Sequence, residues 1–119
     1  MTEPATERVV ICRIAGERFA LPVAVVREVV AVPPVIRVPG APAPVRGIAN
    51  LHGTLVTAVS GPLLLGLAAG EETCLVVLTM EQGRVGITVE EVEDVESAAP
   101  GDHLQLEPLL RPLLAGSSN

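Results

Sequence analysis

Residues 9–29 contain three short motifs, Val9-Val10-Ile11-Cys12, Phe19-Ala20-Leu21-Pro22-Val23 and Val26-Arg27-Glu28-Val29. Each motif has an equivalent 66 residues later, in Leu75-Val76-Val77-Leu78, Val85-Gly86-Ile87-Thr88-Val89 and Val92-Glu93-Asp94-Val95. An internal repeat decides the architecture, because each copy is one supersecondary unit that buries its apolar face against the other copy. The sequence therefore predicts two similar lobes in one chain.

The length of the chain limits how independent the two lobes can be. Lobes this small in a chain of 119 residues are stable only if they share a core, because small domains bury too little surface alone. We therefore expect a single domain over residues 8–114, with a pseudo-repeat at 8–66 and 74–114. Residues 1–7 and 115–119 are predicted to be flexible tails.

The composition excludes several classes of function. Hydrophobic residues make up 49% of the chain but Phe19 is its single aromatic residue, so stacking platforms for single-stranded nucleic acid are absent. The net charge of -6 also disfavours a phosphate backbone as partner. No apolar stretch approaches the length of a bilayer span, and the first residues lack the pattern of a signal peptide. We expect a cytoplasmic protein that neither binds nucleic acid nor inserts into a membrane.

Metal, cofactor and catalytic motifs are likewise not predicted. Cys12 and Cys74 lie in apolar runs and are interpreted as small buried hydrophobic residues, while His52 and His103 have no potential ligand at metal-site spacing. Ser60-Gly61-Pro62 differs from the Gly-x-Ser-x-Gly turn of serine hydrolases, and no phosphate-binding glycine loop occurs. The sequence predicts neither a cofactor nor a catalytic residue.

Local patterns predict mostly β structure. Residues 8–14 and 74–80 are short Val, Leu and Ile runs, each followed by a turn and a second apolar run, which indicates two β-hairpins. The spacing of Val23, Val26 and Val29, and of Val89, Val92 and Val95, suggests one or two helical turns after each hairpin. Five prolines between residues 33 and 44 predict an extended connection. Pro108 and Pro112 are expected to break the Leu-rich stretch 104–114 into pieces shorter than one helix.

These features together resemble the CheW-like domain of bacterial chemosensory coupling proteins. The resemblance rests on Gly16-Glu17-Arg18-Phe19-Ala20-Leu21-Pro22, Val26-Arg27-Glu28-Val29, the link through Pro39 and Pro44, Val45-Arg46-Gly47-Ile48-Ala49-Asn50-Leu51-His52-Gly53, and residues 84–95. It implies an all-β fold of two SH3-like five-stranded β-barrels, here sharing one core, with the second incomplete at its C-terminus. It also implies a non-catalytic adaptor that joins the cytoplasmic tip of a chemoreceptor to the regulatory domain of a histidine kinase.

The chain departs from the family pattern in three places. His52 stands where the family usually has Arg, and Thr57-Ala58-Val59-Ser60-Gly61-Pro62 replaces a Pro-Val-Val-Asp-Leu-Arg pattern. A further loop and strand that close the second half of a typical member would lie beyond residue 119. The resemblance therefore supports receptor binding better than kinase coupling, which we expect to be reduced or absent. The short, divergent pattern is similar to the FrzB type of gliding-motility pathways.

The resemblance also places the receptor-binding surface. Its predicted residues are Val26, Glu28, Val29, Gly47, Asn50, His52 and Gly53. An aliphatic groove with a polar rim would suit the apolar face of a receptor helical hairpin. The alternative is that the valines belong to the core and that the loop from Gly47 to Gly53 only forms a barrel corner. Replacement of Arg by His52 removes a permanent charge, because histidine is largely neutral at pH 7.

Three functions follow from these observations. The leading hypothesis is an adaptor that binds a chemoreceptor tip with reduced or absent kinase coupling. An ordinary coupling protein, in which Leu104 to Leu114 replaces the missing strands and keeps the kinase contact, is the alternative. A small-ligand or enzymatic barrel domain is a remote third. The sequence leaves the oligomeric state open, since an exposed Leu-rich edge would favour self-association.

Overall fold

The computed structural model describes residues 5–81 and 83–114, which are mostly β structure. Its strands are β1 (Glu7–Ile14), β2 (Glu17–Pro22), β3 (Val26–Ala31), β4 (Val35–Ile36), β5 (Val45–Leu51), β6 (Thr54–Ser60), β7 (Cys74–Met80), β8 (Gly83–Val89) and β9 (Glu91–Ala98). Helical structure in the same residues is a 3₁₀ turn η1 (Val23–Val25), a short helix α1 (Gly61–Leu64) and a helix α2 (Leu106–Leu114). The structure thus confirms a chain that is mostly β.

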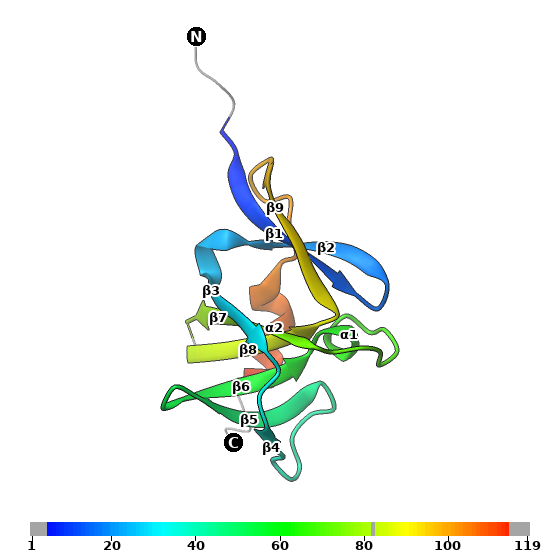
Figure 1. Cartoon of the computed structure of the whole chain (residues 1–119), viewed down its shortest axis with the longest axis vertical. Helices are drawn as coiled ribbons and strands as arrows, with labels where there is room; N and C mark the ends of the chain where they lie inside the picture. Colours follow the sequence, from blue (N-terminus) through cyan, green and yellow to red (C-terminus); the bar gives the residue numbers. More distant parts are fainter. Residues whose placement is uncertain (1–4, 82, 115–119) are drawn as a thin grey trace.

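The strands pair into two sheets. One has the order β2-β1-β9 and the other the order β3-β7-β8-β6-β5-β4. Neighbours in the larger sheet are antiparallel except β6 and β8, which run parallel. Figure 1 shows the smaller sheet above the larger one, with β3 descending from the first to the second. The predicted hairpins are present as β1–β2 and β7–β8.

The two copies of the repeat exchange their third strands. β3 follows the hairpin β1–β2 in the chain but pairs with β7, and β9 follows the hairpin β7–β8 but pairs with β1. The registers of the two exchanged pairs are equivalent, because a bulge interrupts both pairs at the same position of the repeat. In the β3–β7 pair the bulge lies between Val26 and Glu28 of β3, and in the β1–β9 pair it lies beside Cys12 of β1. Each copy therefore completes the sheet of the other copy.

This exchange corrects the helical interpretation of the valine spacing. Val26 and Val29 lie in β3, and Val92 and Val95 lie in β9, so only η1 is helical. β-branched side chains lose rotamer freedom in a helix and pack well on a pleated surface. Here that preference, together with an available strand partner, outweighed a spacing that also fits a helix.

The largest apolar cluster draws residues from both sheets. It contains Val10, Cys12, Ile14 and Leu21 from the smaller sheet, Val59, Val76, Leu78, Met80, Val85, Ile87 and Val89 from the larger sheet, and Leu106 and Leu110 from α2. A second cluster lies within the larger sheet and consists of Val56, Ala58, Leu75 and Val77. The two copies of the repeat thus pack around one common core.

The expectation that prolines divide the C-terminal stretch is wrong, because residues 106–114 form one helix. Pro108 falls in the first turn of α2, where the backbone N–H has no partner within the helix in any case. Pro112 lies inside the helix and removes one hydrogen bond. Leu106 and Leu110, four residues apart, are both buried against the common core, and this burial offsets the loss.

The larger sheet is curled, because its two edge strands are consecutive in the chain. β3 and β4 are separated only by residues 32–34, although they lie at opposite ends of the strand order. Val32 and Val35 from this connection pack against the second cluster, beside Leu75 and Val77 in the centre of the sheet. A sheet whose edges are joined in this way folds around its own core.

The first strand begins at Glu7, one residue before the expected start of the domain and inside the stretch expected to be a flexible tail. Glu7 already belongs to this strand, and its Oε1 accepts a hydrogen bond from the backbone N of Gly101 at 3.1 Å. The ring of His103 lies 3.3 Å from the same oxygen. The remaining tail residues, 1–4 and 115–119, lie outside the described residues. The single domain expected over 8–114 stays a prediction.

Candidate functional site

β3 carries three of the predicted receptor-binding residues and presents them differently. Val26 is half-buried and packs against the common core, whereas 41% of Val29 is exposed. Glu28 lies between them, with 35% of its side chain exposed. The core interpretation thus applies to Val26, and Val29 is an exposed aliphatic residue of β3.

The β5–β6 hairpin carries the other four residues and ends in a two-residue turn. His52 and Gly53 have positive φ values of 54° and 84°, the pattern of a type I′ turn between antiparallel strands. Asn50 Oδ1 accepts a hydrogen bond from the backbone N of Gly53 at 2.9 Å. Asn50, His52 and Gly53 are exposed, so the turn presents polar groups to solvent on a fixed backbone.

Gly47 has a packing role at the start of the same hairpin. It is buried at a bulge of the β5–β6 pairing and has a φ of 145°. A Cβ at this position would collide with the backbone carbonyl of Ile36 in β4. The structure therefore places Gly47 inside the sheet, where it lets β4 approach β5, and not at the exposed surface.

One contact joins the two groups of predicted residues. His52 Nε2 lies 3.7 Å from Glu28 Oε1, so the β5–β6 turn reaches β3 even though these strands are not neighbours in the sheet. The side chain of His52 is 75% exposed, and an exposed pair of this kind contributes at most about 1 kcal/mol. The contact matters for geometry, because it shows that the β5–β6 turn lies close to β3 at Glu28.

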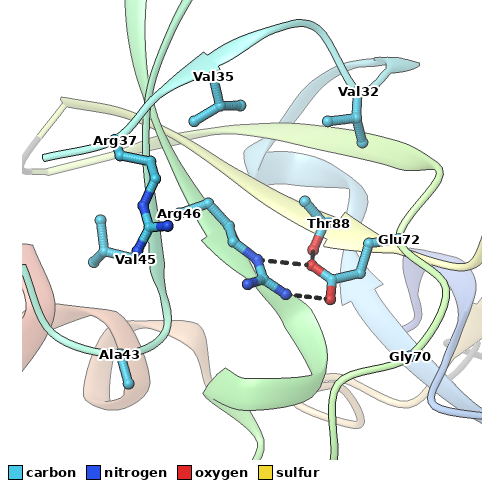
Figure 2. A pocket seen from close by; sticks show the side chains of 9 residues that line it. All are labelled: Val32, Val35, Arg37, Ala43, Val45, Arg46, Gly70, Glu72 and Thr88. Atoms are coloured by element: carbon cyan, nitrogen blue, oxygen red, sulfur yellow. Dashed lines mark hydrogen bonds and ion pairs between the residues drawn. The ribbon is translucent and has the colours of Figure 1, made fainter.

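A second polar site lies on the larger sheet and was not predicted from the sequence. Arg46 donates two hydrogen bonds to Glu72, from Nε to Oε1 at 3.2 Å and from Nη2 to Oε2 at 2.6 Å. Thr88 Oγ1 donates to the same Glu72 Oε1 at 2.7 Å (Figure 2). Glu72 and Arg46 are 26 positions apart in loops and strand ends, and no local pattern links them. The sequence itself shows only an isolated arginine, Arg46, next to Gly47.

The environment of Glu72 favours its ionised form. Its side chain is only 12% exposed, and this burial by itself would raise the pKa. The hydrogen bonds from Arg46 and Thr88 outweigh burial and hold the pKa of Glu72 below its ordinary value. Glu72 is therefore a carboxylate, and the two hydrogen bonds that it accepts hold the Arg46 guanidinium in one orientation.

The acidic strand β9 is largely solvated, with one exception. Glu91, Asp94 and Glu96 are exposed, but Glu93 is 20% exposed and lies between two arginines. Arg13 and Arg18 both donate to its carboxylate. Burial opposes ionisation, yet these two donors lower the pKa of Glu93 below its usual range. The acidic face is thus partly neutralised by one arginine from β1 and one from β2.

The part of the chain that the structure describes shows no obvious site for chemistry other than binding. Within residues 5–81 and 83–114, no three His, Cys, Asp or Glu side chains are grouped so that they could hold a metal ion. Cys12 is fully buried, and burial raises the pKa of its thiol to about 12. A thiol of this kind is a packing group, because the reactive form is the thiolate. No helix of the same residues has the length and apolarity to cross a membrane.

Comparison with known proteins bears on the family and the fold of the chain. The model of the family described as the CheW-like domain matches residues 8–117. The "Chemotaxis protein CheW" of Rhizobium meliloti (strain 1021) is 31% identical over 93 residues, which cover 76% of this chain and 60% of that protein. The crystal structure of the scaffolding protein TtCheW from Thermoanaerobacter tengcongensis has a similar fold, with a TM-score of 0.74 and 21% identity over 81% of this chain and 68% of that one. The chain thus spans about 60% of the length of the curated relative.

Proposed function

The chain belongs to the CheW-like domain family, and on that premise we propose that it is a non-catalytic adaptor of a bacterial chemosensory pathway. Its partner is the cytoplasmic tip of a chemoreceptor, and it acts in the cytoplasm. The similarity to a chemotaxis protein and to a scaffolding protein supports this role. The same kinship supports the expectation of two SH3-like barrels, although the described strands pair into sheets of three and six strands.

The observation that carries the receptor-binding proposal is the contact of Glu28 with His52. It brings the polar β5–β6 turn to β3, the strand whose exposed aliphatic residue is Val29. An apolar patch with a polar rim is the surface that accepts an amphipathic helix. In this arrangement Val29 contacts the apolar face of the receptor hairpin, while Glu28, Asn50, His52 and Gly53 form the rim.

The finer part of the proposal is that kinase coupling is reduced or absent. Where the family pattern continues with Asp-Leu-Arg, the chain has Ser60-Gly61-Pro62, and all three residues are buried. Ser60 Oγ accepts a hydrogen bond from the backbone N of Leu63 and so caps α1. A pair of opposite charges is thereby replaced by a capped, buried turn, which removes charged contacts from this end of β6.

The alternative is an ordinary coupling protein that bridges receptor and kinase. In that case α2, which already packs on the common core, would present its outer face to the kinase. The FrzB type of gliding-motility pathways is the variant closest to the leading proposal. The ordinary coupling protein binds both the receptor and the kinase, whereas the proposed adaptor binds the receptor and has reduced or absent binding to the kinase.

Two titrations separate these functions. The purified chain is titrated with a receptor-tip fragment and, separately, with the regulatory domain of the kinase, by isothermal titration calorimetry. The proposal predicts saturable binding to the receptor fragment and binding to the kinase domain that is at least roughly tenfold weaker or undetectable. Tight binding of both would support the ordinary coupling protein. Absence of receptor binding would overturn the adaptor role.

A further inference from the structure

A cavity of about 540 Å³ lies on the larger sheet beside the Arg46–Glu72 pair, and none of its lining residues belongs to the predicted receptor-binding set. Its lining combines aliphatic and charged side chains from the proline-rich connection, β5, β8 and the loop before β7: Val32, Val35, Arg37, Ala43, Val45, Arg46, Gly70, Glu72 and Thr88. Figure 2 shows the two arginines and Glu72 around this space. The cavity is therefore amphipathic, with two cationic groups and one anionic group.

The guanidinium of Arg46 is fixed in one orientation by other groups of the protein. Its Nε and one terminal nitrogen are directed at Glu72, and its other terminal nitrogen is directed away from Glu72 (Figure 2). Glu72 is in turn fixed by Thr88, which is 2% exposed and also accepts a hydrogen bond from the backbone N of Gly61 at 3.1 Å. A guanidinium fixed in this way loses little side-chain freedom on binding, and it still has donors to offer.

Arg37 supplies the charge that is not compensated. It is exposed, and no carboxylate of residues 5–81 and 83–114 lies within 4.0 Å of its guanidinium. With Arg46 paired to Glu72, the cavity as a whole carries one surplus positive charge. A monoanion balances this charge, whereas the second charge of a phosphate would be opposed by the nearby carboxylate of Glu72.

We propose that this cavity binds a carboxylate with a short aliphatic stem. Arg37 pairs with the carboxylate as a fork, and the free nitrogen of Arg46 adds a donor. Val32, Val35 and Val45 contact the stem. Two sources have this chemistry, the side chain of a glutamate in a protein partner and a free carboxylic acid. The cavity is lined by none of the residues predicted to bind the receptor, Val29 included. The carboxylate proposal therefore does not depend on the receptor-binding proposal.

The test is an NMR titration of the ¹⁵N-labelled chain, observed through the arginine Nε–H signals and the backbone signal of Gly70. The probes are propionate, the capped peptide acetyl-Ala-Ala-Glu-Ala-Ala-amide, the same peptide with Gln in place of Glu, and inorganic phosphate. Saturable shifts with propionate or the Glu peptide, and weaker or no shifts with the Gln peptide and phosphate, support the site. Binding of propionate alone identifies a free acid as the ligand, and binding of the Glu peptide identifies a side chain.

Two variants with the same change of charge complete the test. Arg37→Gln removes the uncompensated guanidinium, and binding is expected to weaken at least roughly tenfold. Arg27→Gln, at an exposed position of β3 outside the cavity lining, is expected to leave binding unchanged. Both positions are exposed, so the amide spectrum of each variant should remain that of the folded chain. Equal loss in both variants, equal binding of the Gln peptide, or shifts that never saturate would overturn the proposal.

Discussion

Val29 and Val95 occupy equivalent positions in the two exchanged strands. Val29 lies opposite Val76 in the β3–β7 pairing, and Val95 lies opposite Val10 in the β1–β9 pairing, which is the same register one repeat apart. The two side chains are exposed to almost the same extent, 41% and 43%. The fold thus contains an internal duplicate of the residue that we assign to the receptor contact.

This duplicate provides a matched control for the receptor surface. Val29→Glu is expected to lower affinity for a receptor-tip fragment at least roughly tenfold, because it places a charge at the centre of an apolar contact. Val95→Glu is expected to keep the affinity of the parent chain. Thermal unfolding should show that both variants remain folded with similar losses of stability, within about 1 kcal/mol of each other. If Val95→Glu weakens binding as much, the contact lies elsewhere.

Replacement of Gly47 should destabilise the fold without any involvement of a partner. A Cβ there collides with the backbone of Ile36, and alanine rarely adopts a φ of 145°. Gly47→Ala is expected to lower the free energy of unfolding by about 3 kcal/mol or more. Gly53→Ala is the control: its φ of 84° is also strained, but a Cβ there meets no atom within 4 Å.

The loss expected for Gly53→Ala is about 1 kcal/mol, the cost of the left-handed backbone alone. Urea denaturation at equilibrium measures both values. Equal losses for the two variants would mean that β4 moves away from β5 and relieves the collision.

Truncation of Leu110 tests how strongly α2 is held on the core. Leu110 is completely buried in the common cluster, so Leu110→Ala should cost about 2–5 kcal/mol. Leu109→Ala changes a half-buried neighbour and should cost clearly less. Hydrogen exchange of the α2 amides should increase in the first variant before the sheets open. A loss below that of Leu109→Ala would show that α2 contributes little to the core.

The pH dependence of stability should reflect Glu72. Its pKa lies below the ordinary value in the folded chain, so the unfolded chain binds its proton first as the pH falls. The stabilisation is complete above the ordinary glutamate pKa of about 4.3 and is lost as the pH falls through the lower folded value. The free energy of unfolding should therefore decline with falling pH below about pH 5.

Glu72→Gln should reduce the steepness of that decline, while the part due to Glu93, whose pKa is also lowered, remains. Urea titrations of both chains between neutral and acidic pH measure the difference. An unchanged slope in the variant would mean that Arg46 and Thr88 do not favour the ionised form of Glu72.

Local sequence determined the secondary structure where one preference dominated. Short β-branched runs followed by turns predicted the hairpins β1–β2 and β7–β8, and the repeat predicted their equivalence. The spacing of the valines led to a wrong prediction of helical turns, because spacing shows only which side of an element is apolar. Which of two elements forms depends also on the partner strand, and that partner lies in the other copy of the repeat.

The site follows the same division. The family resemblance marked the residues of β3 and of the β5–β6 turn, but which of them are exposed depends on packing: Val26 on the core, Gly47 beneath β4, Val29 at the surface. The contact of Glu28 with His52 and the pairing of Arg46 with Glu72 join segments distant in the chain. Such contacts arise only when the sheet curls around its core and brings these segments together.

The sequence by itself determined a duplicated, mostly β chain and its kinship with one family, because repeats, apolar runs and turns are properties of short segments. The tertiary structure decided the exchange of β3 and β9, the survival of α2 despite its prolines, and the cavity around Arg46. Each of these depends on burial and pairing between distant residues. Those free energies exist only in the assembled fold, where the common core of both copies has formed.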